Sequence, residues 1–238
     1  DMKTSRDTYA DCVEYIVNEC ELAARDLPNK FRGINTGRAT AGSCKGLISR
    51  VRLYEASKLF NGSDFGKSAG FPKELIGHLE YNKERWKTAV DAALDVIKMN
   101  TFSIYSNHKD EKGNSEPGWG FYAIFHNNDF CTVPDGANGV TYTNGSYCEM
   151  IFECRPGEGN QREALFGPPT CGGNGNGGYI YHDLVEQFPM KDGKPIGTSS
   201  EYPYDPMNPA EGRDPRFANT VVWNGSVMMS GGDKDHIV

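Results

Sequence analysis

The first hundred residues carry apolar positions at helical spacing. In YADCVEYIVNECELAARDLP, apolar side chains recur at steps of three and four, which predicts an amphipathic helix with one buried stripe formed by Tyr9, Val13, Ile16, Cys20, Ala23 and Leu27. Thr4 and Asp7 have the spacing of a capping box before this helix, and Pro28 is expected to end it.

Two further helices follow the same pattern. TAGSCKGLISRVRLYEASKLF predicts a second helix with a stripe of Cys44, Leu47, Val51 and Tyr54. Glycine costs a helix about 1 kcal/mol relative to alanine, so Gly42 and Gly46 indicate that another helix backbone approaches closely there. NKERWKTAVDAALDVIKMN predicts a third helix with Asn82 as its N-cap and a stripe of Trp86, Val90, Ala93 and Ile97.

After Tyr105 the pattern changes to polar, Gly- and Asn-rich segments with short apolar runs. The runs GFYAIF, YCEMIFEC and TVVWNG predict a few short strands. We therefore expect a mainly α fold, with a tetratricopeptide-like helical layer over residues 1–105 and an irregular, loop-rich lobe over residues 106–238. The two parts are expected to form a single domain, 1–238.

Composition and charge limit the classes of function that the chain can have. With 37% hydrophobic and 24% charged residues the chain is globular in character, and 28 glycines and 13 prolines indicate many loops. The net charge of −7, without any Lys/Arg-rich run, argues against a nucleic-acid partner. The longest apolar run is too short for a predicted membrane span.

The seven cysteines do not have the spacing of a metal site or of a C-x-x-C redox motif. Cys148 and Cys154 are too far apart along a single extended segment for a disulfide, and Cys12, Cys20 and Cys44 fall on helical patterns. We expect all seven to be reduced, and we expect neither a metal nor a cofactor.

The stretch EGRDPRFANTVVWNG combines opposite charges with a proline. Asp214 before Pro215 predicts an N-cap and the first position of a short helical turn, with Arg213 and Arg216 pairing with Asp214 or with nearby acids. Residues 219–223 are expected to form a short strand that ends in an Asn224-Gly225 turn. These charges are interpreted as a structural brace.

Three stretches together resemble the SusD/RagB family. GRATAGSCKGLISRVRLYEASKLFNG is similar to one family helix, and WKTAVDAALDVI followed by TFSIY is similar to the next. LVEQFPMKDGKPI with YDPMNPAEGRDPRFANTVVWNG resembles a family block that is more specific than the helices. The resemblance runs in the family's order from about Thr8 to Gly225.

The resemblance implies a SusD-like fold and a non-enzymatic, cell-surface lipoprotein of Bacteroidetes-type outer membranes. Such proteins bind oligosaccharides or other nutrients and deliver them to a SusC-like, TonB-dependent transporter. It also implies that this chain is an internal portion, with the lipid anchor carried by an N-terminal segment outside it.

Sugar binding needs flat aromatic faces for the C–H side of the rings and polar groups for the hydroxyls. The candidate aromatic residues are Trp119, Tyr179 and Tyr181, and the candidate polar residues are Asn174, Asn176 and Arg155. The alternative is that Trp119 packs on the helical layer and the tyrosines are half-buried strand residues. Trp86 and Trp223 lie on apolar runs and are predicted to be core residues.

Two other functions stay open. One is a helical-repeat scaffold that binds only another protein. The other is a glycoside hydrolase, for which the candidate carboxylate pairs are Glu149 with Glu153 and Asp183 with Glu186, beside His182.

Overall fold

The computed structural model describes most of the chain, namely residues 5–31, 35–65, 69–104, 118, 121, 132–134, 141–143, 149–153, 165–174, 178–227 and 237–238. The chain divides into two compact units. The first comprises Asp1–Ile104 with Tyr147–Arg155, and the second comprises Tyr105–Ser146 with Pro156–Val238. Each unit is described by itself below.

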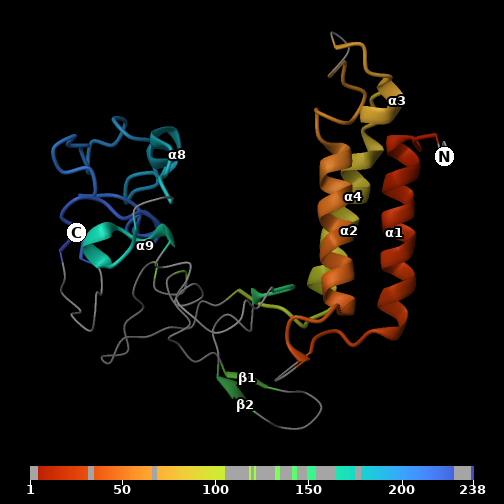
Figure 1. Ribbon diagram of the computed structural model, residues 1–238, viewed down its shortest axis with the longest axis horizontal. Coiled ribbons are helices and arrows are strands. Elements are labelled where there is room, and N and C mark those ends of the chain that lie inside the picture. Colours follow the sequence, from red (N-terminus) through yellow and green to blue (C-terminus); the bar gives the residue numbers. More distant parts are fainter. Residues whose placement is uncertain are drawn as a thin grey trace. The chain divides into compact units, whose positions relative to one another are not determined.

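The first unit is built on three long helices and one short one. They are α1 (Tyr9–Asp26), α2 (Ala41–Ala56), α3 (Lys73–Ile76) and α4 (Glu84–Lys98). The long helices lie side by side, and α2 packs against both α1 and α4 (Figure 1). The predicted mainly helical fold is confirmed.

Local sequence sets the ends of these helices. The Thr8 side chain accepts a hydrogen bond from the backbone N–H of Asp11 at 3.1 Å, so the cap lies one turn after the predicted Thr4–Asp7 box, of which Thr4 is outside the described residues. The helix ends at Asp26 because Leu27, which precedes Pro28, is extended, as predicted. The N-cap of α4 is Lys83, which makes no side-chain capping hydrogen bond, so the predicted N-cap is wrong by one residue; the Asn82 side chain accepts from the N–H of Glu84 at 3.0 Å.

The second helix begins with a capping box that the sequence analysis did not include. The Thr40 hydroxyl accepts from the Ser43 N–H at 3.0 Å, and the Ser43 hydroxyl accepts from the Thr40 N–H at 2.7 Å. Two donors at the helix start are thereby satisfied reciprocally.

The predicted stripes of α2 and α4 are wrong in part. Leu47 and Tyr54 are exposed, whereas Cys44 and Ile48 are buried on α2. On α4, the predicted core residues Trp86 (42% exposed), Val90 and Ile97 point away from α2, and Ala89 is buried instead. Small side chains at the contact let two helix backbones pack closely, so size decided the contact face and hydrophobicity alone did not.

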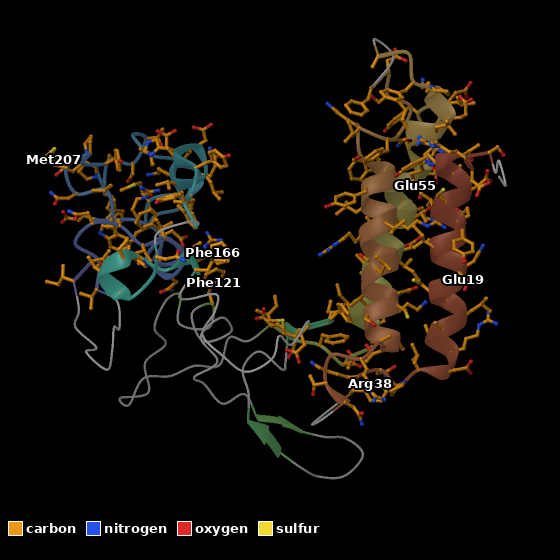
Figure 2. The ribbon with its side chains drawn as sticks, viewed as in Figure 1. Glu19, Arg38, Glu55, Phe121, Phe166 and Met207 are labelled. Carbon is orange, nitrogen blue, oxygen red and sulfur yellow. The ribbon has the colours of Figure 1, made fainter. Side chains whose placement is uncertain are left out.

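A polar cluster lies between the helices of the first unit. The Glu55 carboxylate is buried there (Figure 2), 2.9 Å from Arg52, 2.8 Å from His78 and 3.7 Å from Arg85. Arg52 also donates to Glu14 on α1 at 2.7 Å. These contacts join α1, α2, α4 and the segment after α3, so the buried Glu55 carboxylate has cationic and hydrogen-bonding partners inside the unit.

The second unit has little regular structure among the residues described. A two-stranded antiparallel sheet pairs β1 (Thr132–Pro134) with β2 (Thr141–Thr143), and it is followed by the 3-10 turn η3 (Pro169–Cys171), α8 (His182–Gln187) and α9 (Pro215–Thr220). Met190 and Phe217 are its most deeply buried large side chains. Trp223 packs on Phe217 with ring centroids 5.2 Å apart, which confirms the predicted core role of Trp223.

The strands lie elsewhere than predicted. Residues 149–153 of YCEMIFEC contain no strand, and most of GFYAIF is outside the described residues. In TVVWNG the helix α9 extends to Thr220, and the next three residues are extended without a strand partner within the described structure. The Asn224-Gly225 turn is present, and the Ser226 N–H donates to the Trp223 carbonyl at 2.9 Å.

The charged residues of the EGRDPR segment (residues 211–216) have two different structural roles. Asp214 caps α9 and holds Arg216 at 2.8 Å, as predicted. Among the described residues Arg213 pairs with no acid: its guanidinium donates to the carbonyls of Val185 (2.6 Å), Phe188 (2.9 Å) and Pro209 (3.1 Å). Arg213 is buried, so neighbouring carbonyls replace the expected carboxylate, and the interpretation as a brace is consistent with these contacts.

Candidate ligand-binding site

The Gly/Asn-rich loop of the second unit is held by close backbone contacts. A Cβ on Gly173 would collide with the carbonyl of Gly167, and the Gly173 N–H donates to the Pro168 carbonyl at 3.0 Å. Gly178 has φ +82°, and a Cβ there would lie 2.8 Å from the Phe166 carbonyl. These glycines serve backbone packing at both ends of the loop, so their presence does not require a phosphate cradle.

Two tyrosines follow this loop with their rings in solvent. Tyr179 is 83% exposed and Tyr181 is 86% exposed, so the alternative of half-buried strand tyrosines is wrong. They are two residues apart in an extended segment that leads into α8, which places both side chains toward one side. Phe166, which contacts Gly178, is also partly exposed (Figure 2). Exposed aromatic rings of this kind can stack on a sugar or on another flat ligand.

The other predicted site residues have different outcomes. Asn174 is exposed at the near end of the same loop. Trp119, Asn176 and Arg155 lie outside the described residues. Gly118, which precedes Trp119 in the sequence, accepts a hydrogen bond from Asn219 of α9 at 3.3 Å.

Of the acidic pairs considered for hydrolysis, Asp183 and Glu186 both lie exposed on α8. Glu186 is also 3.3 Å from His182, a contact typical of a solvated helix face. Glu149 and Glu153 are half-buried residues of the first unit. A glycosidase needs one carboxylic acid whose pKa is raised by burial, and the exposed positions of Asp183 and Glu186 do not provide that burial.

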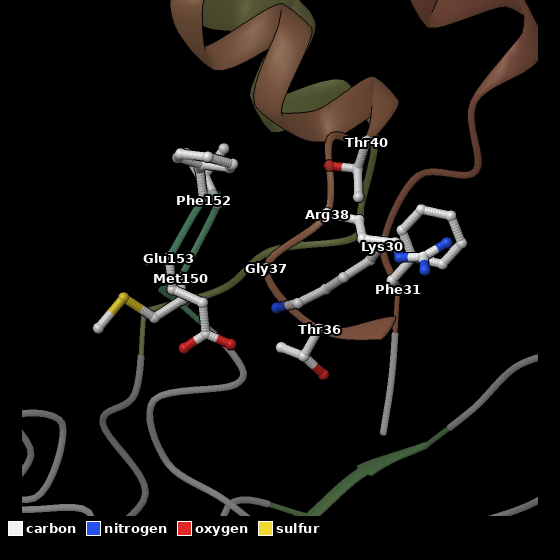
Figure 3. Close-up of a pocket in the computed structure, with 10 residues that line it drawn as sticks. Lys30, Phe31, Thr36, Gly37, Arg38, Thr40, Met150, Phe152 and Glu153 are labelled. Carbon is white, nitrogen blue, oxygen red and sulfur yellow. The ribbon is translucent and has the colours of Figure 1, made fainter. Parts of the chain in front are cut away.

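A small pocket lies in the first unit, where the loop before α2 meets residues 150–153. Figure 3 shows Lys30, Arg38 and Thr36 on one side and Phe152 and Glu153 on the other. The cavity volume is about 20 Å³, which is room for about one water molecule. The pocket was missed by the sequence analysis because its two sides are more than a hundred residues apart, and it is too small to hold a sugar ring.

A wider groove of about 160 Å³ runs between α1, α2 and α4. Its floor includes Val17 and Ile48, and Glu21, Asp91 and Asp95 line it. The groove has no aromatic lining residue, so it does not offer the stacking surface that sugar recognition uses.

Neither a metal cluster nor a membrane-spanning helix is found among the described residues. No group of three or more His, Cys, Asp or Glu side chains in that part of the chain has the arrangement of a metal site. None of the helices described is both long and apolar enough to cross a bilayer.

Comparison with known proteins gives a match in sequence and a match in fold. Residues 140–236 match the sequence model of the SusD family. The crystal structure of a SusD-like protein from Bacteroides fragilis superposes with a TM-score of 0.56 at 20% identity. That alignment covers 95% of this chain and 37% of the Bacteroides protein, so the chain spans little more than a third of its length. The comparison with curated proteins found no match.

The fold is therefore that of a SusD-like protein, with mainly helical architecture. The family match covers the block that contains EGRDPRFANTVVWNG, the stretch that carried the strongest resemblance. The sequence match to the SusD family covers residues 140–236, which is less than half of this chain, and the structural match is a likeness of fold.

Proposed function

We propose that this chain belongs to a cell-surface protein that binds oligosaccharides without chemical turnover and passes them to a SusC-like, TonB-dependent transporter. The sequence match to the SusD family over residues 140–236 and the SusD-like fold support a glycan-binding role in polysaccharide utilisation, and SusD-like proteins are generally non-catalytic. We propose an outer-membrane location in a Bacteroidetes-type bacterium, through a lipid anchor on the full-length protein.

The observation that carries the proposal is the pair of exposed tyrosines, Tyr179 and Tyr181, after the Gly/Asn-rich loop of the second unit. Two large rings that are more than four-fifths exposed contribute little to the stability of the fold. Their exposure to water is best explained by a ligand that covers them when it binds. We propose that Tyr179 and Tyr181 stack on sugar rings, with Trp119 as a third aromatic residue. Asn174, Asn176 and Arg155 are proposed to bind the hydroxyl groups.

The proposal predicts the effect of removing the two rings. In the full-length protein, Tyr179→Ala and Tyr181→Ala should each weaken binding to a glycan found by array screening by roughly tenfold, because a central aromatic contact contributes more than 1 kcal/mol. Titration calorimetry measures the affinity. Met207→Ala is the matched control, because Met207 is equally exposed in the same unit and should leave the affinity unchanged.

The outcome decides between the candidate functions. Unchanged glycan affinity in the double variant, with an unchanged melting temperature, would overturn the assignment of this surface. If the wild type binds its transporter but none of the glycans, the helical-repeat scaffold is the better description. Release of reducing sugar that is lost in Glu186→Gln would identify a hydrolase.

A further inference from the structure

Each of the two helices α1 and α2 carries a cysteine on the face that packs against the other. Cys20 is half buried on the side of α1 that also holds the buried residues Val13 and Val17. Cys44 is 9% exposed, in the first turns of α2 and on the same face as Ile48. Both thiols therefore point toward the contact between α1 and α2.

Contacts on both sides of the cysteines set the register of this helix pair. At one end, Arg52 of α2 donates to Glu14 of α1 at 2.7 Å. Cys20 lies six residues after Glu14, and Cys44 lies eight residues before Arg52, so an antiparallel pair brings the two cysteines to within about two residues, or ~3 Å, of the same level. At the other end, the Gly42 N–H donates to the Asn29 carbonyl at 3.3 Å, which ties the connecting loop to the start of α2.

The electrostatics of Cys20 agree with this placement. Burial, first, and then the neighbouring Cys44 thiol raise the pKa of the Cys20 thiol. Two cysteines that face each other across a helix pair can form a disulfide when their Cα atoms lie within about 7 Å.

We propose that Cys20 and Cys44 are a disulfide-forming pair, which an external disulfide oxidant converts into a covalent link between α1 and α2. The half-buried Cys20, as its thiolate, attacks one sulfur of the oxidant, which forms a mixed disulfide and releases one thiol. The Cys44 sulfur then attacks Cys20 in this mixed disulfide, which forms the Cys20–Cys44 bond and releases the second thiol. The protein loses two electrons and two protons, and the oxidant becomes two thiols.

The Cys20–Cys44 disulfide would link α1 and α2 covalently and turn the chain between the two cysteines into a closed loop. It would restrict the unfolded chain over the segment from Cys20 to Cys44 and so stabilise the first unit. Its occurrence in the cell rests on the proposed outer-membrane location, because proteins outside the cytosol meet oxidising conditions. Formation of the disulfide in solution depends only on α1 and α2. The disulfide proposal can therefore fail without affecting the glycan-binding proposal, and the reverse also holds.

The test is oxidation of the purified full-length protein with oxidised glutathione. Peptide mapping under non-reducing conditions should find residues 20 and 44 in one linked peptide, with a mass about 2 Da below the sum of the two reduced peptides. The oxidised protein should melt roughly 5–10 °C higher than the reduced protein. Oxidation should be faster at about pH 9 than at about pH 7, because the attacking thiolate is scarce at neutral pH.

Matched variants separate this pair from the remaining cysteines. Cys12 is exposed on α1, so Cys12→Ala should leave both the linked peptide and the rise in melting temperature unchanged. Cys20→Ala and Cys44→Ala should abolish both. A wild-type protein whose residues 20 and 44 remain reduced after equilibration, or whose cysteines link only between molecules, would overturn the proposal, and this mapping needs no variant that folds.

Discussion

Two buried charges in this chain, Glu55 and Arg213, are stabilised by different partners. Glu55 lies between cationic side chains of α2 and α4, and these partners offset the cost of burying its carboxylate. Arg213 lies against three carbonyl groups and above the Phe217 ring at 4.6 Å. Burial lowers the pKa of Arg213 without neutralising it, because a guanidinium stays protonated at any ordinary pH.

Tyr9 allows a prediction about alkaline stability. Burial and the negative charge of Glu55 raise the pKa of Tyr9 to about 12. A raised folded-state pKa means that the folded form keeps the proton more tightly, so the stabilisation is present below pH ~10 and is lost as the pH rises toward 12.

We therefore expect Tyr9→Phe to lose less stability than the wild type between about pH 9 and about pH 11.5. The difference should be on the order of 1 kcal/mol, since the half-exposed ring is partly screened by solvent. Urea unfolding at the two pH values measures it. Tyr15→Phe is the control, because Tyr15 is an exposed tyrosine of the same helix. Identical alkaline losses in wild type and Tyr9→Phe would contradict the prediction.

Helix α2 illustrates packing at the scale of an element. Its glycines were expected to admit another helix backbone, but their neighbours are side chains and a loop carbonyl. A Cβ on Gly42 would lie 2.5 Å from the Phe102 ring and 2.9 Å from the Asn29 carbonyl, and a Cβ on Gly46 would lie 2.9 Å from Ile151. The predicted close approach is confirmed, and the expected partner is wrong.

Gly42→Ala should destabilise the first unit by about 1–3 kcal/mol, because overpacking against a fixed backbone carbonyl outweighs the gain in helix propensity. Gly46→Ala should cost less, since the Ile151 side chain can move aside. Chemical denaturation followed by helical circular dichroism gives both values. Arg50→Ala on the exposed face of α2 is the control and should change stability by less than about 0.5 kcal/mol. A stabilised Gly42→Ala protein would refute this account of the glycine.

At the scale of the whole molecule, each of the two units has buried residues of its own. In the first unit these are residues such as Val17 and Ile48, on α1 and α2. In the second unit they are Met190 and Phe217, around which the loops close without much regular structure. Units with separate cores are expected to respond separately to a core mutation.

Phe217→Ala should remove about 3–5 kcal/mol of stability from the second unit. We expect near-ultraviolet circular dichroism and protease resistance of residues after 165 to be lost first, while the helical far-ultraviolet signal of α1, α2 and α4 persists. The exposed Val222→Ala is the control from the same segment. Simultaneous loss of the helical signal would mean that the two units unfold as one.

The sequence by itself determined the features that depend on neighbouring residues. Helix positions follow from periodicity, the end of α1 from Pro28, and the start of α9 from Asp214 before Pro215. The block around residues 213–217 carried the resemblance to the SusD family, whose sequence model matches residues 140–236. These signals are local, so no packing had to be known to find them.

Only the tertiary structure decided the features that depend on distant partners. It buried Ala89 in place of Trp86, gave Arg213 carbonyl partners in place of an acid, and left Tyr179 and Tyr181 in solvent. It also placed Cys20 and Cys44 on the facing sides of α1 and α2, which no spacing rule in the sequence indicated. Burial depends on the size and shape of what packs against each residue, and a periodic pattern along one chain segment does not contain that information.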